Sequence, residues 1–199
     1  MEVLINGGWV MVALLGLSIT SLAIVLQKLL LIRKTTLKPN FLQLIKTKLS
    51  THTKENLINE LRESRRISGK IAAKTIEKFG ATEAVIHAEI FDLTKEDITN
   101  LTSKMNLLSM IITAAPILGL LGTVLGLMDV FAVIAVEGSV QAELLSAGIS
   151  KALVTTVTGL SLALPLMFVH QFMTEKIEDR LDEWDNIPVQ LIAYMSDLG

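Results

Sequence analysis

The sequence predicts an all-α integral membrane protein with three transmembrane helices, of which the second and third extend into a cytoplasmic helical domain. Its 199 residues are 51% hydrophobic and only 19% charged, which is apolar for a soluble domain of this size. Three stretches contain no charged residue, and they cover 3–27, 105–128 and 152–174. Each exceeds the roughly 20 helical residues that cross a hydrocarbon core of about 30 Å. A soluble protein would have to bury three such helices in one small domain, so we favour the membrane interpretation.

The first transmembrane helix is predicted over residues 1–32. A cleaved signal peptide is the alternative interpretation, but no positively charged region precedes the apolar stretch and no small-residue cleavage site follows it. Instead, Lys28, Arg33 and Lys34 come directly after it. We therefore expect a retained membrane anchor.

Residues 33–104 form the predicted cytoplasmic segment. They hold 14 Lys or Arg against 9 Asp or Glu, whereas 1–27 and 129–150 hold no Lys or Arg. Because positively charged segments stay on the cytoplasmic side, this contrast predicts an outer N-terminus and a cytoplasmic C-terminus. Apolar residues recur at helical spacing in the segment. The stretch from Ala81 has no Pro or Gly before Pro116, so we expect one helix to run from there into the second span.

The second transmembrane helix is predicted over 105–136 and the third over 151–174, joined by a short outer connection over 137–150. After the third span, apolar residues continue at helical spacing beside an acidic face. This pattern predicts a cytoplasmic C-terminal helix over 175–199.

The residue patterns of enzyme active sites and metal centres are missing from the sequence. The chain has no cysteine, which excludes disulfides, thiolate metal sites and cysteine nucleophiles. Its three histidines, His52, His87 and His170, are far apart, and we interpret each as a solvated or interfacial imidazole. We therefore predict no enzyme activity, no catalytic residue, no metal and no cofactor. The mild net charge of −2 argues against a nucleic-acid partner.

Small residues form one stripe on each of the second and third spans. In lipid, such stripes let two helix backbones approach closely, because packing rather than hydrophobic burial drives association there. The predicted packing residues are Ala115, Gly119, Gly122 and Gly126 in the second span and Gly148, Gly159 and Ala163 in the third. A helix-pair interface explains them without a pore. Pro116 and Pro165 lie inside the same spans and predict helix kinks, because each removes a backbone hydrogen bond.

Hydroxyl groups also lie at membrane depth, on Thr123 in the second span and on Thr155, Thr156 and Thr158 in the third. Each can bond to a carbonyl one turn back in its own helix. The three in the third span fall within four positions, however, and cannot all share one lipid-shielded face. At least one should therefore line a polar interior or contact another subunit.

Together these spans resemble the two-span signature of the ExbB/TolQ/MotA proton-channel family. The resemblance rests on PILGLLGTVLG at 116–126, GISKALVTTVTGL at 148–160 and ALP at 163–165. Three spans with a large cytoplasmic segment make the chain similar to the ExbB/TolQ branch.

The resemblance implies the channel-forming subunit of an inner-membrane motor driven by the proton-motive force. In such a motor several copies, typically five, enclose a lumen lined by the second and third spans. A single-span partner of the ExbD/TolR type places an aspartate in that lumen, and the complex energises an envelope protein of the TonB or TolA type. The family's lumen-facing threonines correspond to Thr123 and Thr156, with Thr155 beside them. A partner carboxylate fits this sequence, which has none in the middle of any span.

Lys151 departs from the family pattern, which carries a glutamate at this position. It precedes Thr156 by five residues and is expected near the outer mouth, about 7.5 Å from that threonine along the helix. Its ammonium either snorkels to the interface or pairs with Asp129, Glu143 or a carboxylate of the partner. Two other interpretations of the chain remain open: a non-conducting oligomeric membrane scaffold, and a sodium-driven motor of the same architecture.

Overall fold

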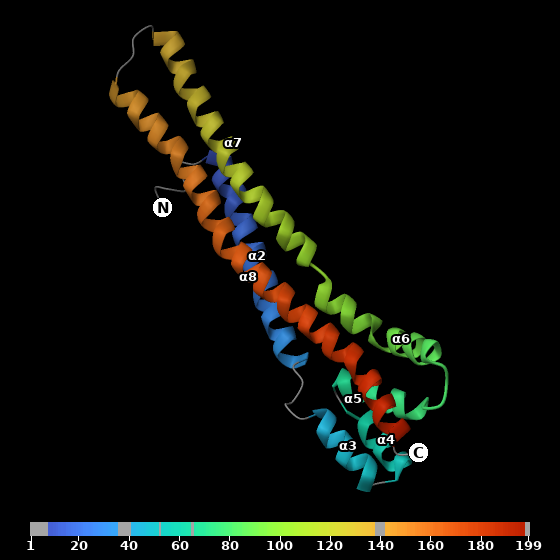
Figure 1. The fold of residues 1–199 in the computed structure, drawn as a ribbon. Helices are drawn as coiled ribbons and strands as arrows, with labels where there is room; N and C mark the ends of the chain where they lie inside the picture. The colour runs from blue at the N-terminus through green and yellow to red at the C-terminus, as the bar shows by residue number, and fades with distance from the viewer. Residues whose placement is uncertain (1–7, 36–40, 52, 65, 138–141, 198–199) are drawn as a thin grey trace. The chain divides into compact units, whose positions relative to one another are not determined.

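The protein consists of helices joined by short connections. The computed structural model describes residues 8–35, 41–51, 53–64, 66–137 and 142–197, and these contain no strand. Figure 1 shows the helices, which are α2 (Gly8–Thr35), α3 (Phe41–Thr51), α4 (Lys54–Arg62), α5 (Ile67–Glu77), α6 (Glu83–Thr102), α7 (Met105–Glu137) and α8 (Ala142–Asp197). Three segments are long and apolar enough to cross a membrane, and they lie in α2, in α7 with the preceding helix, and in α8. The predicted fold class, an all-α membrane protein with three spans, is confirmed.

Two compact units make up the chain. The apolar unit comprises residues 1–27 and 104–173, and the polar unit comprises residues 28–103 and 174–199. Helices α2 and α8 each begin in the apolar unit and end in the polar unit. The three uncharged stretches of the sequence therefore fall in the apolar unit, except for Thr174 at the end of the third stretch.

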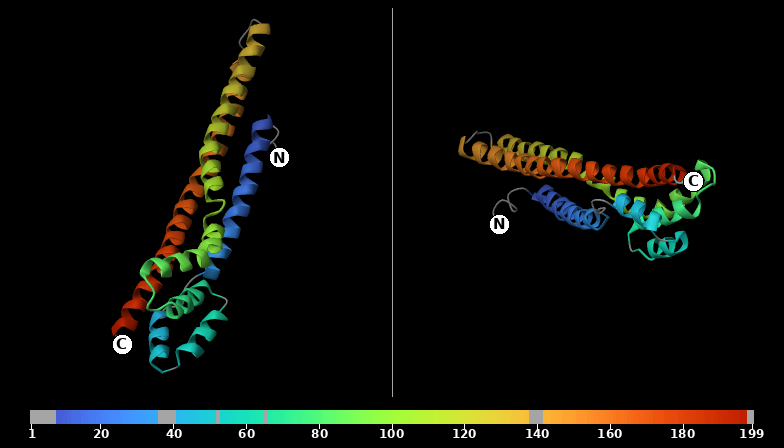
Figure 2. Two further views of the ribbon diagram at one scale, coloured as in Figure 1. Left: turned by 90° about the vertical axis from the view of Figure 1, so that its right-hand side faces the viewer. Right: turned by 60° about the horizontal axis from the view of Figure 1, so that its bottom comes forward.

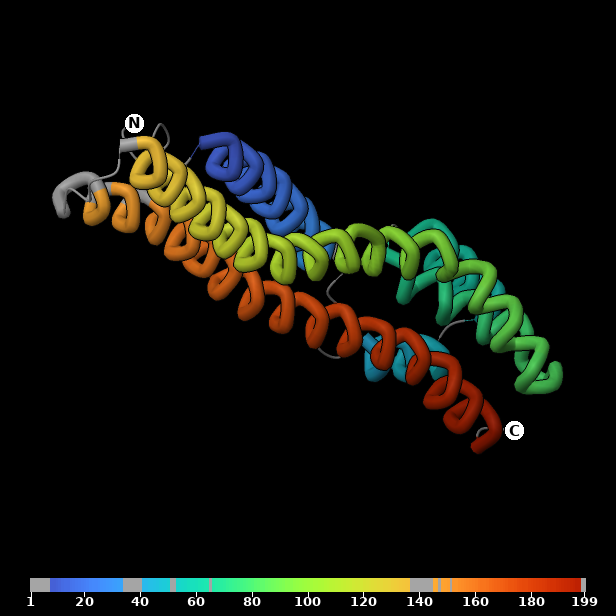
Figure 3. The backbone as a smooth tube through the Cα atoms, turned by 90° about the horizontal axis from the view of Figure 1, so that it is seen from above, coloured from blue at the N-terminus to red at the C-terminus, as the bar shows by residue number. Residues whose placement is uncertain are grey.

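Within the apolar unit, α7 and α8 lie side by side and antiparallel, and α2 runs along them in the direction of α8 (Figures 1, 2 and 3). Val10 and Leu14 of α2 pack against Ala115 of α7 and Ala163 of α8. The small alanine side chains allow the three helices to meet at this level, because packing in lipid depends on close backbone approach.

Large apolar side chains cover the outside of the apolar unit. Ile19 and Phe168 are each 69% exposed, and Leu120 is 59% exposed. A soluble monomer rarely presents so much contiguous apolar surface. This surface suits a protein that is surrounded by lipid or by other subunits.

Helix α6 does not continue into α7, so the predicted uninterrupted helix from Ala81 onward is wrong. Helix α6 ends at Thr102, and Lys104 adopts a left-handed backbone with φ of 64° before α7 begins. The physical reason lies on α2. Lys28 is 1% exposed, and its ammonium donates to the carbonyls of Asn100, at 2.6 Å, and Leu101, at 2.9 Å. A cation is favourable at the carbonyl end of a helix, so these carbonyls are satisfied without a further helical turn.

Helix α8 is longer than the sequence predicted. It begins at Ala142, inside the predicted outer connection, and runs through Pro165 to Asp197. Pro116 likewise lies inside α7 and does not end it. The four residues 138–141 lie outside the described part of the chain.

In the polar unit, α5 carries the most buried face. Ile71 and Ala72 are fully buried, and Ile76 is 4% exposed. Across from this helix, Glu89 of α6 binds Lys74 of α5 at 2.8 Å. The hydrogen bond from Lys74 lowers the pKa of Glu89, and the same bond raises the pKa of Lys74. An ion pair thus links α5 to α6 on the surface.

Candidate ion-pathway site

Glycines allow α7 and α8 to touch backbone to backbone. A methyl group placed on Gly159 would meet the carbonyl oxygen of Ala115 at 2.5 Å, and one on Gly119 would meet the carbonyl oxygen of Thr155 at 2.8 Å. A methyl group on Gly126 would meet the Ala152 side chain at 2.8 Å. Real side chains do not approach so closely, so none of these positions accepts a larger residue without a shift of the helices.

The remaining predicted packing residues lie along the same helix pair. A methyl group on Gly122 would come within 2.6 Å of the Thr155 hydroxyl, and one on Gly148 would overlap the Val130 side chain of α7. Ala115 is fully buried and Ala163 is 6% exposed. All seven residues therefore lie in the contact between α7 and α8 or in the adjoining contact with α2.

Three threonine hydroxyls meet at this contact. The hydroxyls of Thr123 and Thr156 are hydrogen-bonded to each other across the two helices. The Gly119 carbonyl accepts hydrogen bonds from Thr155 at 3.0 Å and from Thr156 at 3.1 Å. The Ala152 carbonyl accepts from Thr123 at 3.1 Å and from Thr155 at 2.7 Å. Two carbonyls and three hydroxyls thus form one polar cluster between two apolar helices.

The threonines of the cluster differ in how far they are buried. Thr155 is 2% exposed, and its hydroxyl is enclosed between the helices. Thr123 and Thr156 are only half-buried, so their hydroxyls lie at the edge of the helix contact. Thr158 donates to the Val154 carbonyl of its own helix at 2.8 Å. The two half-buried threonines are therefore the members that water, an ion or another helix could reach.

The cluster contains no group that changes charge near neutral pH. A hydroxyl can donate and accept hydrogen bonds at the same time, and a carbonyl can only accept. In the described residues no three His, Cys, Asp or Glu side chains come together as a metal site. The cluster can position water or bind an ion weakly, but a proton would need a titratable group supplied from elsewhere.

The predicted charges at the outer mouth are not brought together by the described residues. Asp129 is exposed on α7. The side chains of Glu143 and Lys151 lie outside the described residues, although both positions belong to α8. Pairing of Lys151 with either carboxylate therefore stays a prediction.

Sequence patterns did not indicate the backbone acceptors of this cluster. The carbonyls of Gly119 and Ala152 each accept from two or more hydroxyls. Sequence patterns indicate side chains and not main-chain atoms, so they did not indicate a site whose acceptors are main-chain carbonyls. The sequence feature that could have indicated the Ala152 acceptor was its spacing from Thr155, because a threonine hydroxyl commonly bonds to a carbonyl three or four residues back.

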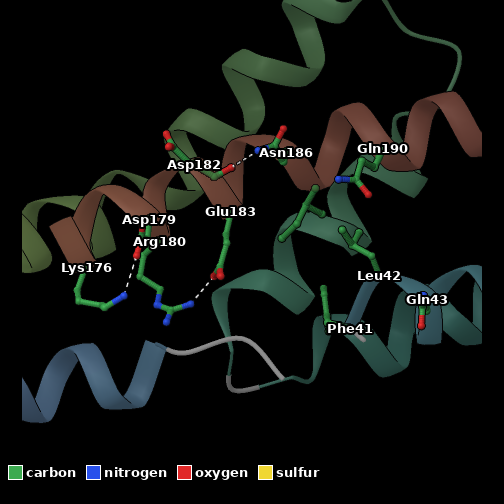
Figure 4. Close-up of a pocket in the computed structure, with 11 residues that line it drawn as sticks. Phe41, Leu42, Gln43, Lys176, Asp179, Arg180, Asp182, Glu183, Asn186 and Gln190 are labelled. Carbon is green, nitrogen blue, oxygen red and sulfur yellow. Dashed lines mark hydrogen bonds and ion pairs between the residues drawn. The ribbon is translucent and has the colours of Figure 1, made fainter. Parts of the chain in front are cut away.

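A hollow of about 660 Å³ lies in the polar unit between α3 and α8 (Figure 4). Its cations are turned to carboxylates of their own helix, with Lys176 bound to Asp179 at 2.9 Å and Arg180 bound to Glu183. Asn186 donates to the Asp182 carbonyl at 2.9 Å. Both cations that line the hollow are thus paired with carboxylates of α8.

Comparison with known proteins shows which family this sequence resembles. Residues 63–186 match the model of the MotA/TolQ/ExbB proton channel family. The biopolymer transport protein ExbB-like 3 of Synechocystis sp. is 31% identical over 170 residues, which cover 83% of this chain and 81% of that protein.

Two further relatives match over shorter stretches. ExbB of Aquifex aeolicus is 33% identical over 87 residues, and an ExbB homolog of Methanothermobacter thermautotrophicus is 35% identical over 103 residues. The matched stretches span 59% and 34% of the length of these two relatives. The family model covers the threonine cluster, both glycine stripes and more than half of the chain. The chain belongs to the MotA/TolQ/ExbB proton channel family and is similar to its ExbB members.

Proposed function

We propose that the chain is the channel-forming subunit of a motor in a bacterial inner membrane, driven by the proton-motive force, that energises an envelope partner of the TonB or TolA type. The observation that carries the proposal is the hydrogen bond between the hydroxyls of Thr123 and Thr156. These half-buried groups form a polar site in helices whose other exposed residues are largely apolar. Polar groups at membrane depth are costly and mark ion pathways.

The chain's own residues supply the walls of the pathway. The threonine hydroxyls orient water, and the glycine contacts hold α7 and α8 at a fixed separation. A single-span partner of the ExbD/TolR type supplies the carboxylate that carries the proton past the hydroxyls. One elementary charge crossing 100 mV releases about 2.3 kcal/mol, so repeated transfers provide energy for conformational work on the envelope partner.

We also propose assembly as a homo-oligomer, with five copies as in the family that the chain resembles. The three helices of one chain cannot enclose a lumen that is wide enough for another helix. The exposed apolar residues of α7 and α8 supply surface for contact between copies. The excess of Lys and Arg in 33–104 supports an outer N-terminus and a cytoplasmic C-terminus.

The test removes the hydroxyls without changing side-chain volume. Thr123→Val and Thr156→Val should each impair energy coupling and proton flux, while the oligomer seen by native mass spectrometry stays intact. Thr113→Val and Thr158→Val are matched controls, because these hydroxyls donate to carbonyls of their own helices at 3.1 Å and 2.8 Å. The controls should retain coupling.

Two other functions are outcomes of the same measurements. The carbonyl bonds of Thr123 and Thr156 favour a non-conducting scaffold as the second candidate, because they satisfy the hydroxyls without water. Wild-type coupling in the double variant would support that scaffold and refute the channel. Flux that follows a sodium gradient and not a proton gradient would identify a sodium-driven motor.

A further inference from the structure

His170 is the one ionisable residue in the three uncharged stretches of the sequence. Those stretches hold 72 residues between them, and their other polar side chains are hydroxyls and amides. An ionisable side chain at membrane depth is rare and typically belongs to an ion pathway or a proton relay. The threonine cluster lacks such a group, so the position of His170 relative to the cluster determines whether His170 can belong to the same pathway.

The helical period places His170 on the same side of α8 as the cluster. It follows Thr156 by 14 residues, which is close to four turns of a helix with 3.6 residues per turn. The two side chains therefore point within about 40° of each other and are about 21 Å apart along the axis. Both belong to the apolar unit and to one unbroken helix.

Burial agrees with this placement. The buried residues of α8 recur at intervals of three and four positions, and they include Ala152, Thr155, Ala163, Leu166 and Met173. His170 falls in this series between Leu166 and Met173 and is half-buried. Its imidazole therefore lies on the packed side of the helix rather than on the outward side that carries Phe168.

The charge pattern places His170 at one end of the span. Phe168, two residues earlier, is 69% exposed and belongs to the outer apolar surface. Glu175, five residues later, is the first charged residue after the uncharged stretch. In the proposed orientation this end faces the cytoplasm, so His170 lies where a proton leaving the cluster would reach water.

Few charged residues lie near His170 in the part of the chain that the structure describes. The contact of Gly159 with Ala115 sets the antiparallel alignment of α8 and α7, and the same alignment places the first turn of α7 beside His170. The charged group there is Lys104, whose ammonium binds the Gln27 side chain of α2 at 2.8 Å. Residues 8–27 of α2 contain no ionisable side chain, and Lys28 comes next. On α8 itself, Glu175 and Lys176 follow.

We propose that His170 takes up protons from the channel lumen and releases them on the cytoplasmic side. This inference rests on the proposed proton-channel function. The neutral ring accepts a proton from lumen water and then releases a proton to cytoplasmic water. The ring returns to the neutral form, so each cycle moves one proton and consumes no other reactant. Imidazole suits this task because its ring nitrogens can accept and donate a proton, whereas a threonine hydroxyl does not change its charge.

The experiment measures proton flux in vesicles that hold the oligomer with its single-span partner, under an imposed membrane potential and with a pH-sensitive dye. His170→Gln keeps a polar side chain of similar size but cannot be protonated. It should lower the flux by about 100-fold, the low end of the contribution of a positioned acid–base group. His87→Gln is the matched control, because His87 is exposed on α6.

Chemical rescue separates proton transfer from structural support. His170→Ala should lose flux, and free imidazole on the cytoplasmic side should restore it with a pH dependence that follows the concentration of the neutral base. A structural role would give a loss that imidazole does not restore, and this would overturn the proposal. If His170→Ala fails to assemble, the pH profile of His170→Gln decides: a profile like the wild type overturns the proposal, and a flattened profile supports it.

Failure of the inference is distinguishable from failure of the proposed function. Normal proton flux in the His170→Gln oligomer would overturn the role of His170 and leave the channel in place. No proton flux in the wild-type complex would overturn the channel, and the role of His170 with it.

Discussion

The substitution Gly159→Ala tests how closely α7 and α8 approach. The added methyl group would lie 2.5 Å from the carbonyl oxygen of Ala115 and 3.3 Å from the Cα of Gly119. Contacts under 3.0 Å essentially never occur, so the helices must separate by at least about 0.5 Å at this level. Overpacking of this kind costs about 1–3 kcal/mol.

Gly16→Ala is the matched control for the same chemical change. A methyl group on Gly16 of α2 has no atom within 4 Å. Both substitutions replace glycine by alanine inside a helix, and both gain about 1 kcal/mol of helix propensity. The difference between the two variants therefore measures the packing cost alone. For a chain of this length, each kcal/mol corresponds to about 2–4 °C in melting temperature.

The assay is thermal unfolding of the detergent-solubilised oligomer, followed by circular dichroism and by size-exclusion chromatography. Gly159→Ala should melt several degrees below Gly16→Ala and should release monomers at lower temperature. Equal melting temperatures would refute the reasoning, because they would show that the backbones of α7 and α8 are not in contact at Gly159.

Charged contacts in the polar unit give the remaining predictions. Lys28→Met leaves the buried Leu101 carbonyl and the half-buried Asn100 carbonyl at the end of α6 without this donor, and it should destabilise the unit by about 1–3 kcal/mol, read from the fluorescence of the buried Trp184. Lys95→Met, at an exposed lysine, is the control, and equal stability of the two would contradict the role of Lys28. The bond from Lys74 lowers the pKa of Glu89, so its contribution to stability is present above the usual value of 4.5 and disappears as the pH falls through the lowered pKa. Glu89→Gln should therefore be less stable than the wild type at about pH 7, and the difference should shrink as the pH falls below 4.5; a difference that does not shrink in acid would contradict the ion pair.

The three spans could be predicted from sequence because charge is excluded from hydrocarbon. A stretch such as 152–174, with no charged residue in 23 positions, has no simpler explanation. The spacing of Gly119, Gly122 and Gly126 likewise indicated one face of a helix. The absence of charge therefore predicted the spans, and the spacing of small residues predicted the side on which they pack.

The break between α6 and α7 could not be predicted in the same way. It depends on Lys28, which is more than 70 residues away in the sequence from the carbonyls that it binds. It also depends on Lys104, a residue that carries no local signal for a left-handed backbone. No Pro or Gly at 102–105 ends the helix, and a long-range contact stabilises its end there. Sequence patterns describe local preferences, and the contact that decides here is tertiary.

At the threonine cluster, the close packing of α7 and α8 also creates the polar contacts. Because Gly119 has no side chain, the backbone of α8 comes close enough for Thr155 and Thr156 to donate to its carbonyl. A scaffold and a channel would therefore share this geometry, and the contact alone does not separate them. The two functions differ in what the hydroxyls do once the helices are in place. In a scaffold, loss of activity should follow loss of assembly, as expected for Gly159→Ala. In a channel, Thr123→Val and Thr156→Val should impair coupling in oligomers that are fully assembled, and that separation of coupling from assembly identifies an ion pathway.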